Sequence, residues 1–123
     1  MSWEILLAVL IMMESSGDSL AIGDDGRSVG ILQIGTMVVD DVNRVYQTKY
    51  TYEDRYKANV SKDLCRWYLS WYARAERIGE EKHNTYEAYA RIWNGGPDGW
   101  KKKSTQKYWD KFQRVANEMG FVL

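Results

Sequence analysis

The chain is poor in the residues that build disulfides, metal clusters and sharp bends. Its 123 residues include one cysteine, one histidine and one proline. A lone cysteine excludes an internal disulfide, and one Cys with one His disfavours a structural zinc site. We therefore expect no metal and no cofactor. Scarce proline suits a helical protein, because proline breaks helix interiors.

Neither sign of charge is in excess. The 17 basic and 17 acidic residues give a formal net charge of +0 at pH 7. Balanced charge and the lack of a recognisable motif argue against nucleic acid as a partner. The run Lys101–Lys103 is expected to be a solvated loop; the alternative is attraction to an anionic polymer such as bacterial cell wall.

The only long apolar run, residues 5–13, is too short to span a bilayer. It also lacks the basic start and small-residue cleavage site of a signal peptide, and Glu4 precedes it. We therefore expect no membrane span and no export signal in this chain. The run predicts a first core helix from Trp3 to about Ser15, capped by Ser2 and stopped near Gly17.

Apolar spacing predicts further helices, and the length fits a single domain over residues 1–123, expected to be a monomer. The expected helices are 37–47 capped by Thr36, 59–78, 86–93 capped by Thr85, and a last one to about 119 capped by Ser104 or Thr105.

Residues 17–30 are rich in Gly, Asp and Ser and predict turns, with a small hairpin of Ser28-Val29 and Gly30-Ile31 beside the Asp24-Asp25-Gly26 turn. The expected architecture is mainly α, with a central buried helix surrounded by helices. A small loop or β-hairpin region near residues 20–34 completes it.

Aromatic residues are plentiful, with six Trp and nine Tyr. Core packing is the first interpretation for most of them, and a groove of flat rings that stacks on sugars is the second. Cys65 lies among apolar residues and is expected to be a buried, inert thiol, since His83 shows no sign of pairing with it.

Glu14 ends the apolar run and is the leading catalytic candidate. A carboxyl at the end of an apolar helix loses hydration, which favours the protonated form and raises its pKa. A carboxylic acid protonated near neutral pH is suited to general acid catalysis. The plainer alternative is an exposed, inert acid of the following turn.

Four short motifs follow one another along the chain: Glu14-Ser15-Ser16-Gly17, then Gly30-Ile31-Leu32-Gln33-Ile34, Ile92-Trp93-Asn94-Gly95-Gly96 and Thr105-Gln106-Lys107-Tyr108. This ordered set resembles the lysozyme superfamily, above all the soluble lytic transglycosylase branch and similar phage endolysins and goose-type lysozymes. The resemblance implies an α+β lysozyme-like fold. It also implies cleavage of the β-1,4 bond between N-acetylmuramic acid and N-acetylglucosamine, with peptidoglycan strands as partner and the bacterial cell wall as place of action.

The resemblance also assigns roles. Glu14 is the implied acid/base, Ser15 fixes the helix end, and Gln33 contacts substrate or orders the site. The implied sugar-binding residues are Trp93, where the family usually has Tyr, with Asn94 and Gly95; Tyr108 is implied to hydrogen-bond near Glu14. The family often has Pro after the Gln-Ile pair, whereas Gly35-Thr36-Met37 follows here.

The second carboxylate of a glycosidase is not obvious. In chicken-type lysozymes it falls at the position of Ser28, and the nearest acids are Asp24 and Asp25. Without it, the substrate's N-acetyl group can assist and a 1,6-anhydro product forms, which is the lytic transglycosylase route and the favoured one. The alternatives are a muramidase in which Asp24 or Asp25 places water, with inversion, and a non-catalytic peptidoglycan-binding module.

Overall fold

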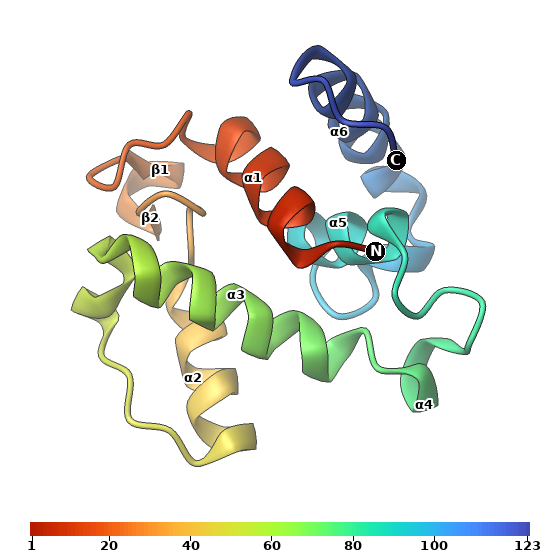
Figure 1. Cartoon of the computed structure of the whole chain (residues 1–123). Helices are drawn as coiled ribbons and strands as arrows, with labels where there is room; N and C mark the ends of the chain where they lie inside the picture. Colours follow the sequence, from red (N-terminus) through yellow and green to blue (C-terminus); the bar gives the residue numbers. More distant parts are fainter. The chain divides into compact units, whose positions relative to one another are not determined.

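A computed structural model describes all 123 residues. The chain contains six α-helices, four short 3-10 segments and one antiparallel pair of two-residue strands (Figure 1). This confirms the mainly α class with a small hairpin near residues 20–34. The elements are α1 (Trp3–Glu14), β1 (Ile22–Gly23), β2 (Ser28–Val29), α2 (Thr36–Tyr46), α3 (Ala58–Tyr72), α4 (Ala75–Ile78), α5 (Tyr86–Gly95) and α6 (Gln106–Glu118).

The chain divides into two compact units. One contains residues 1–10 and 69–123, and the other contains residues 11–68. The divisions fall inside α1 and α3, so each of these helices supplies residues to both units. No helix is both long and apolar enough to cross a bilayer. The expectation of one domain and of a monomer stays a prediction.

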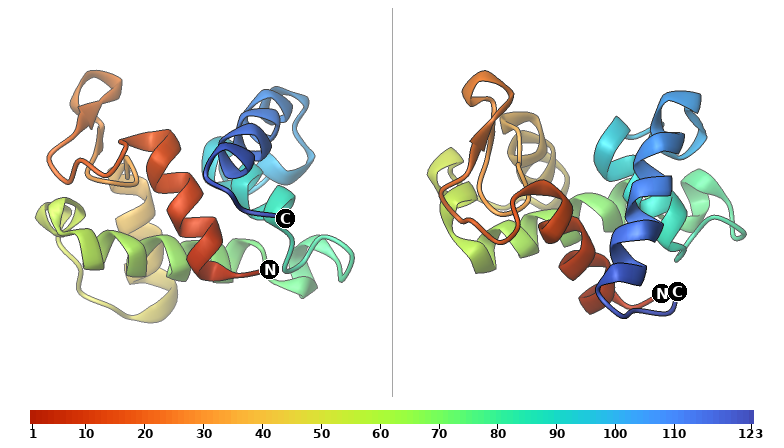
Figure 2. Two further views of the ribbon diagram at one scale, coloured as in Figure 1. Left: turned by 45° about the horizontal axis from the view of Figure 1, so that its top comes forward. Right: turned by 90° about the horizontal axis from the view of Figure 1, so that it is seen from above.

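In the unit of residues 1–10 and 69–123, α5 packs against α6 and against the 3-10 segments η3 (Gly99–Lys101) and η4 (Lys103–Thr105), as Figure 2 shows. Ser2 accepts from the Ile5 N–H as the predicted cap of α1. Its own N–H bonds the Tyr86 hydroxyl at 2.9 Å. The side chains that are fully buried in this unit include Leu6, Val9, Leu10, Ile92 and Phe112.

In the unit of residues 11–68, β1 and β2 pair across the 3-10 segment η1 (Asp24–Gly26). The partner of Ser28-Val29 is therefore Ile22–Gly23 and not Gly30-Ile31, which corrects the predicted hairpin. Val29 also forms an isolated bridge with Ile34. The fully buried core includes Val29, Leu32, Ile34, Val39, Val42 and Leu64.

The predicted helix over residues 59–78 is wrong in length, because α3 ends at Tyr72 and a separate α4 follows. Two arginines just downstream explain the break. Arg74 donates to the carbonyl of Trp71 at 2.6 Å, and Arg77 donates to that of Tyr72 at 3.1 Å. These side chains satisfy carbonyls that a continuing helix would use.

The predicted caps have mixed outcomes. The Thr85 hydroxyl accepts from the Ala88 N–H at 3.2 Å, which confirms that cap. Thr36 is the first residue of α2 and Gly35 is its N-cap, so the predicted Thr36 cap is wrong. Thr105 stands at the N-cap of α6 without a capping hydrogen bond, because its hydroxyl is used elsewhere.

Most of the aromatic residues that were predicted to pack in the core are half-buried rather than fully buried. None of the six Trp is fully buried, and Trp67 is 38% exposed. Tyr68 and Tyr89 are buried, whereas most other tyrosines are half-buried. The aromatic rings therefore lie mostly at the edges of the units, where a ring can be part wet and part packed.

Candidate active site

The predicted site residues are divided between the two units. Glu14, Gln33, Ser28 and the pair Asp24-Asp25 belong to residues 11–68. Trp93, Asn94, Gly95 and Tyr108 belong to the unit of residues 1–10 and 69–123.

Glu14 is the last residue of α1 and is half-buried. The turn behind it is fixed by Ser15, whose hydroxyl donates to the Ile31 carbonyl at 2.7 Å and accepts from the Gly17 N–H at 3.1 Å. Ser16 and Gly17 both have positive φ, at 54° and 92°. The Glu-Ser motif therefore ends the helix abruptly and ties it to the second motif, which confirms the structural role predicted for Ser15.

Cys65 lies near Glu14 in this unit, and its pKa is raised by burial and by the charge of Glu14. The thiol is fully buried, and burial raises its pKa well above the ordinary value; the nearby Glu14 carboxylate raises the pKa further. Both causes disfavour the thiolate. Cys65 is thus the inert thiol that the sequence predicted, and Glu14 lies within electrostatic range of a dry interior.

The Gln33 side chain makes its hydrogen bonds within the loop that surrounds it. Its backbone is left-handed at φ 51°, and its Nε2 donates to the carbonyls of Ala21 at 3.1 Å and Gly30 at 3.0 Å. Its Oε1 occupies the space that a Cβ on Gly23 would need. Gln33 therefore orders the loop after α1, as one of its two predicted roles requires.

Gly30 shows why the second motif begins with glycine. Its φ is +84°, which disfavours other residues, and a Cβ there would overlap the carbonyl of Arg55. Arg55 is only 8% exposed and donates from Nε to Tyr52 O at 2.8 Å and from Nη1 to Ile34 O at 3.0 Å. This buried arginine was missed from the sequence, because it stands in a polar segment with no apolar spacing.

The two aspartates lie in the hairpin turn, with left-handed φ of 54° at Asp24 and 56° at Asp25. The Asp24 carboxylate pairs with Arg27 at 3.1 Å, and both side chains are mostly exposed. Such an exposed pair contributes little stability. Asp24 and Ser28 also line a surface hollow of about 380 Å³, which Asp25 does not.

Gly95 ends α5, two residues beyond the predicted helix end at Trp93. A Cβ on Gly95 would overlap the methyl group of Thr105, and the Gly95 carbonyl accepts from Lys102 Nζ at 2.7 Å. Asn94 beside it is exposed and Trp93 is half-buried. The third motif is therefore a helix end pressed against the start of α6.

A buried polar network supports this helix end. Thr105 donates to the Gly99 carbonyl at 2.6 Å and accepts from Arg91 Nε at 2.9 Å. Arg91 also donates to Lys102 O at 2.8 Å and pairs with Glu87 at 2.6 Å. The Thr105 hydroxyl and the Arg91 guanidinium thus both have partners, and their hydrogen bonds fix the loop between α5 and α6. Sequence reasoning missed Arg91 inside an amphipathic helix.

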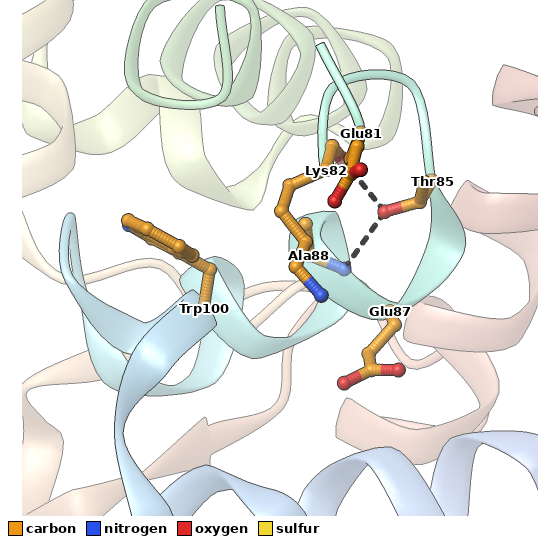
Figure 3. A pocket seen from close by; sticks show the side chains of 6 residues that line it. All are labelled: Glu81, Lys82, Thr85, Glu87, Ala88 and Trp100. Carbon is orange, nitrogen blue, oxygen red and sulfur yellow. Dashed lines mark hydrogen bonds between the residues drawn. The ribbon is translucent and has the colours of Figure 1, made fainter. Parts of the chain in front are cut away.

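Tyr108 lies in the first turn of α6, is half-buried, and has a buried hydroxyl oxygen. A small hollow of about 100 Å³ in the same unit contains none of the predicted site residues (Figure 3). Thr85 borders it and donates to the Lys82 carbonyl at 2.7 Å. No group of three or more His, Cys, Asp or Glu is arranged to hold a metal ion.

No protein-family model and no curated protein matches the chain. Solved structures do match it. The Tapes japonica lysozyme is 27% identical, with a TM-score of 0.74, and the match covers 91% of this chain and 89% of that chain. The structure of Aeromonas hydrophila PliI in complex with Meretrix lusoria lysozyme matches at 26% identity, a TM-score of 0.75, and 97% and 94% coverage. An inhibitor-bound lysozyme from Meretrix lusoria matches at 26% identity, a TM-score of 0.74, and 97% and 94% coverage. The chain has a lysozyme-like fold, as its motifs predicted.

Proposed function

We propose that the chain is a muramidase that cleaves the β-1,4 bond between N-acetylmuramic acid and N-acetylglucosamine in peptidoglycan, and that it acts at the bacterial cell wall. The observation that carries the proposal is the likeness to three lysozyme structures along nearly the whole chain. Glu14 at the fixed end of α1 is consistent with the role that the motifs imply for it.

Glu14 is the proposed general acid. Cleavage passes through an oxocarbenium-like state, so the leaving oxygen needs a proton. A half-buried carboxyl at the end of an apolar helix is a suitable donor. Ser15 and Gln33 are proposed to position it, because their hydrogen bonds fix the two loops that follow α1. Asn94 and the Gly95 backbone are proposed to bind the reacting sugar, with Trp93 and Tyr108.

Hydrolysis is the proposed outcome, with Asp24 placing the water. Three structural neighbours are lysozymes, and Asp24 is held by Arg27 at the edge of the hollow, whereas Asp25 does not line it. The second candidate is lytic transglycosylation. The exposure of the Asp24 side chain favours it, since a solvated carboxylate is a poor substitute for one built into a dry site.

Clearing of a suspension of purified peptidoglycan tests the proposal. The wild type is expected to clear it, and Glu14→Gln is expected to fold normally but to lose clearing. Glu4→Gln is the matched control, because Glu4 is an exposed glutamate on the same helix. Clearing by Glu14→Gln at the wild-type rate would refute the catalytic role, and binding without clearing by the wild type would support a non-catalytic module.

A further inference from the structure

The surface hollow of about 380 Å³ lies wholly within the unit of residues 11–68. We call it the α2 hollow, because the first turn of α2 forms part of its wall. The rest of the wall comes from the hairpin turn and from one residue of the 3-10 segment η2 (Tyr52–Tyr56). Asp24 and Ser28 belong to it, and so do two arginines that no sequence motif indicated, Arg27 and Arg55.

The first turn of α2 brings unpaired backbone N–H groups to the hollow. Its N-cap is Gly35, which has no side chain to accept from them, and no acidic residue lies in the first turn. Gly35, Thr36 and Met37 all line the hollow. The first N–H groups of a helix have no intrahelical acceptor and carry partial positive charge, so they attract anions.

Arg55 provides an independent reason to expect an anion. Its side chain is more than nine-tenths buried, and its hydrogen bonds, from Nε and Nη1, all go to backbone carbonyls. Its guanidinium lies 5.6 Å from the centroid of the Tyr52 ring and has no carboxylate partner, and Nη2 takes part in none of these hydrogen bonds. A buried charge without a counter-ion is costly, so an anion in the hollow would be favoured.

The remaining groups leave the hollow positively charged. The exposed pair of Asp24 and Arg27 is neutral, so Arg55 supplies a net positive charge. Ser28 and Thr36 also line the hollow, and a hydroxyl can donate a hydrogen bond to a bound group.

We propose that the α2 hollow binds an anionic group, a carboxylate or a phosphate. The anion accepts hydrogen bonds from Arg55 Nη2 and from the N–H groups of the first turn of α2. The identity of its source rests on the proposed function: a peptidoglycan substrate supplies carboxylates on its peptide stems, and wall polymers attached to peptidoglycan supply phosphates.

Titration with inorganic phosphate and with acetate, followed by amide NMR at constant ionic strength, tests the proposal. The N–H signals of Thr36, Met37 and Arg55 Nε are expected to shift and to saturate. Thr36→Glu places a carboxylate of the protein at the first turn and is expected to weaken phosphate binding about tenfold or more. Gln47→Glu adds the same charge at the exposed C-terminal end of α2 and is expected to bind as the wild type does.

Arg55 itself is a poor test by deletion, because its removal also breaks backbone contacts. Arg27→Gln is the safer second variant, since it removes only an exposed partner of Asp24, and it is expected to weaken phosphate binding about threefold. Arg44→Gln, which removes another exposed i,i+3 partner, is expected to have no effect. Absence of saturable shifts in the wild type, or unchanged binding by Thr36→Glu, would overturn the proposal.

Two ligands distinguish the possible sources of the anion. A muropeptide with free stem carboxylates, compared with its amidated form, tests the peptide stem, and a soluble teichoic acid fragment tests the phosphate. Binding of inorganic phosphate alone would show an adventitious ion only and would overturn a substrate role. If the wild type clears peptidoglycan without these NMR shifts, only the anion site in the α2 hollow is refuted. If the shifts occur without clearing, only the proposed enzymatic activity is refuted.

Discussion

The contact between Gly95 and Thr105 gives the sharpest prediction of stability. Gly95 ends α5, where helix propensity alone predicts that Gly95→Ala gains about 0.5–1 kcal/mol. The structure predicts the opposite, because the new Cβ would lie closer than 3.0 Å to the Thr105 methyl group. Carbon atoms pack at about 3.5–4.0 Å, so one of the two groups must move.

Thr105 is poorly able to move, since its hydroxyl is bonded to Gly99 and to Arg91 in a buried network. Overpacking of this kind costs about 1–3 kcal/mol. For a chain of this length, that loss lowers the melting temperature by roughly 3–15 °C. Thermal unfolding of Gly95→Ala, followed by circular dichroism, measures the loss.

Thr105→Ser removes the methyl group and keeps the hydroxyl, so it separates packing from hydrogen bonding. The double variant Gly95→Ala/Thr105→Ser is expected to be more stable than the sum of the single effects predicts, with a coupling of about 1–2 kcal/mol. Gly35→Ala is the control, because a Cβ there meets only the Arg27 carbonyl at 3.8 Å. A stabilised Gly95→Ala, or additive single effects, would refute the reasoning.

Three further predictions concern residues 11–68. Ser15→Ala is expected to lose about 1 kcal/mol in chemical denaturation and to lower clearing activity, because the hydrogen bond to Ile31 fixes the turn after Glu14; unchanged activity would contradict the positioning role. Arg55→Met is expected to lose about 2–4 kcal/mol, measured in the same way, since three carbonyls each lose a hydrogen bond from the buried guanidinium, and a variant as stable as the wild type would contradict it. Burial raises the pKa of Cys65 in the folded state. Below the ordinary thiol pKa the thiol is protonated in both states, so stability is fully present there. As the pH rises through the alkaline range, the unfolded thiol ionises first and that stability is lost. Unfolding free energy should therefore fall more steeply above pH 9 in the wild type than in Cys65→Ala, and parallel curves would contradict this.

Local signals made part of the fold predictable from the sequence. The cap at Thr85 and the end of α1 near Gly17 depend on a few neighbouring residues, and the structure confirms both. The turn at Asp24 was also predictable, since Asp and Gly tolerate left-handed backbone. The existence of the helices was also predictable, because apolar spacing is a pattern of residues that lie close together in the sequence.

Long-range contacts made the rest unpredictable. The break after Tyr72 depends on arginine side chains that bond the helix end from downstream. The burial of Arg55 depends on carbonyls of Arg27 and Ile34, which are distant in sequence. The partner of the strand at Ser28 was likewise misassigned, because two-residue strands carry almost no pattern of their own.

The four motifs were the most informative part of the site. Ser15, Gln33 and Gly95 each have a structural task in the fold, and each task explains why that residue type is present. A motif residue is therefore both a candidate for chemistry and a fixed point of the fold. Only a functional measurement separates the two for Glu14.

Digestion of purified peptidoglycan in ¹⁸O-labelled water, with mass spectrometry of the released fragments, tests the central claim most directly. The wild type is expected to release fragments with labelled reducing muramic ends, and Glu14→Gln is expected to release none. Unlabelled 1,6-anhydro ends would replace hydrolysis with transglycosylation. Equal release of fragments by Glu14→Gln and the wild type would contradict the role of Glu14 as the acid.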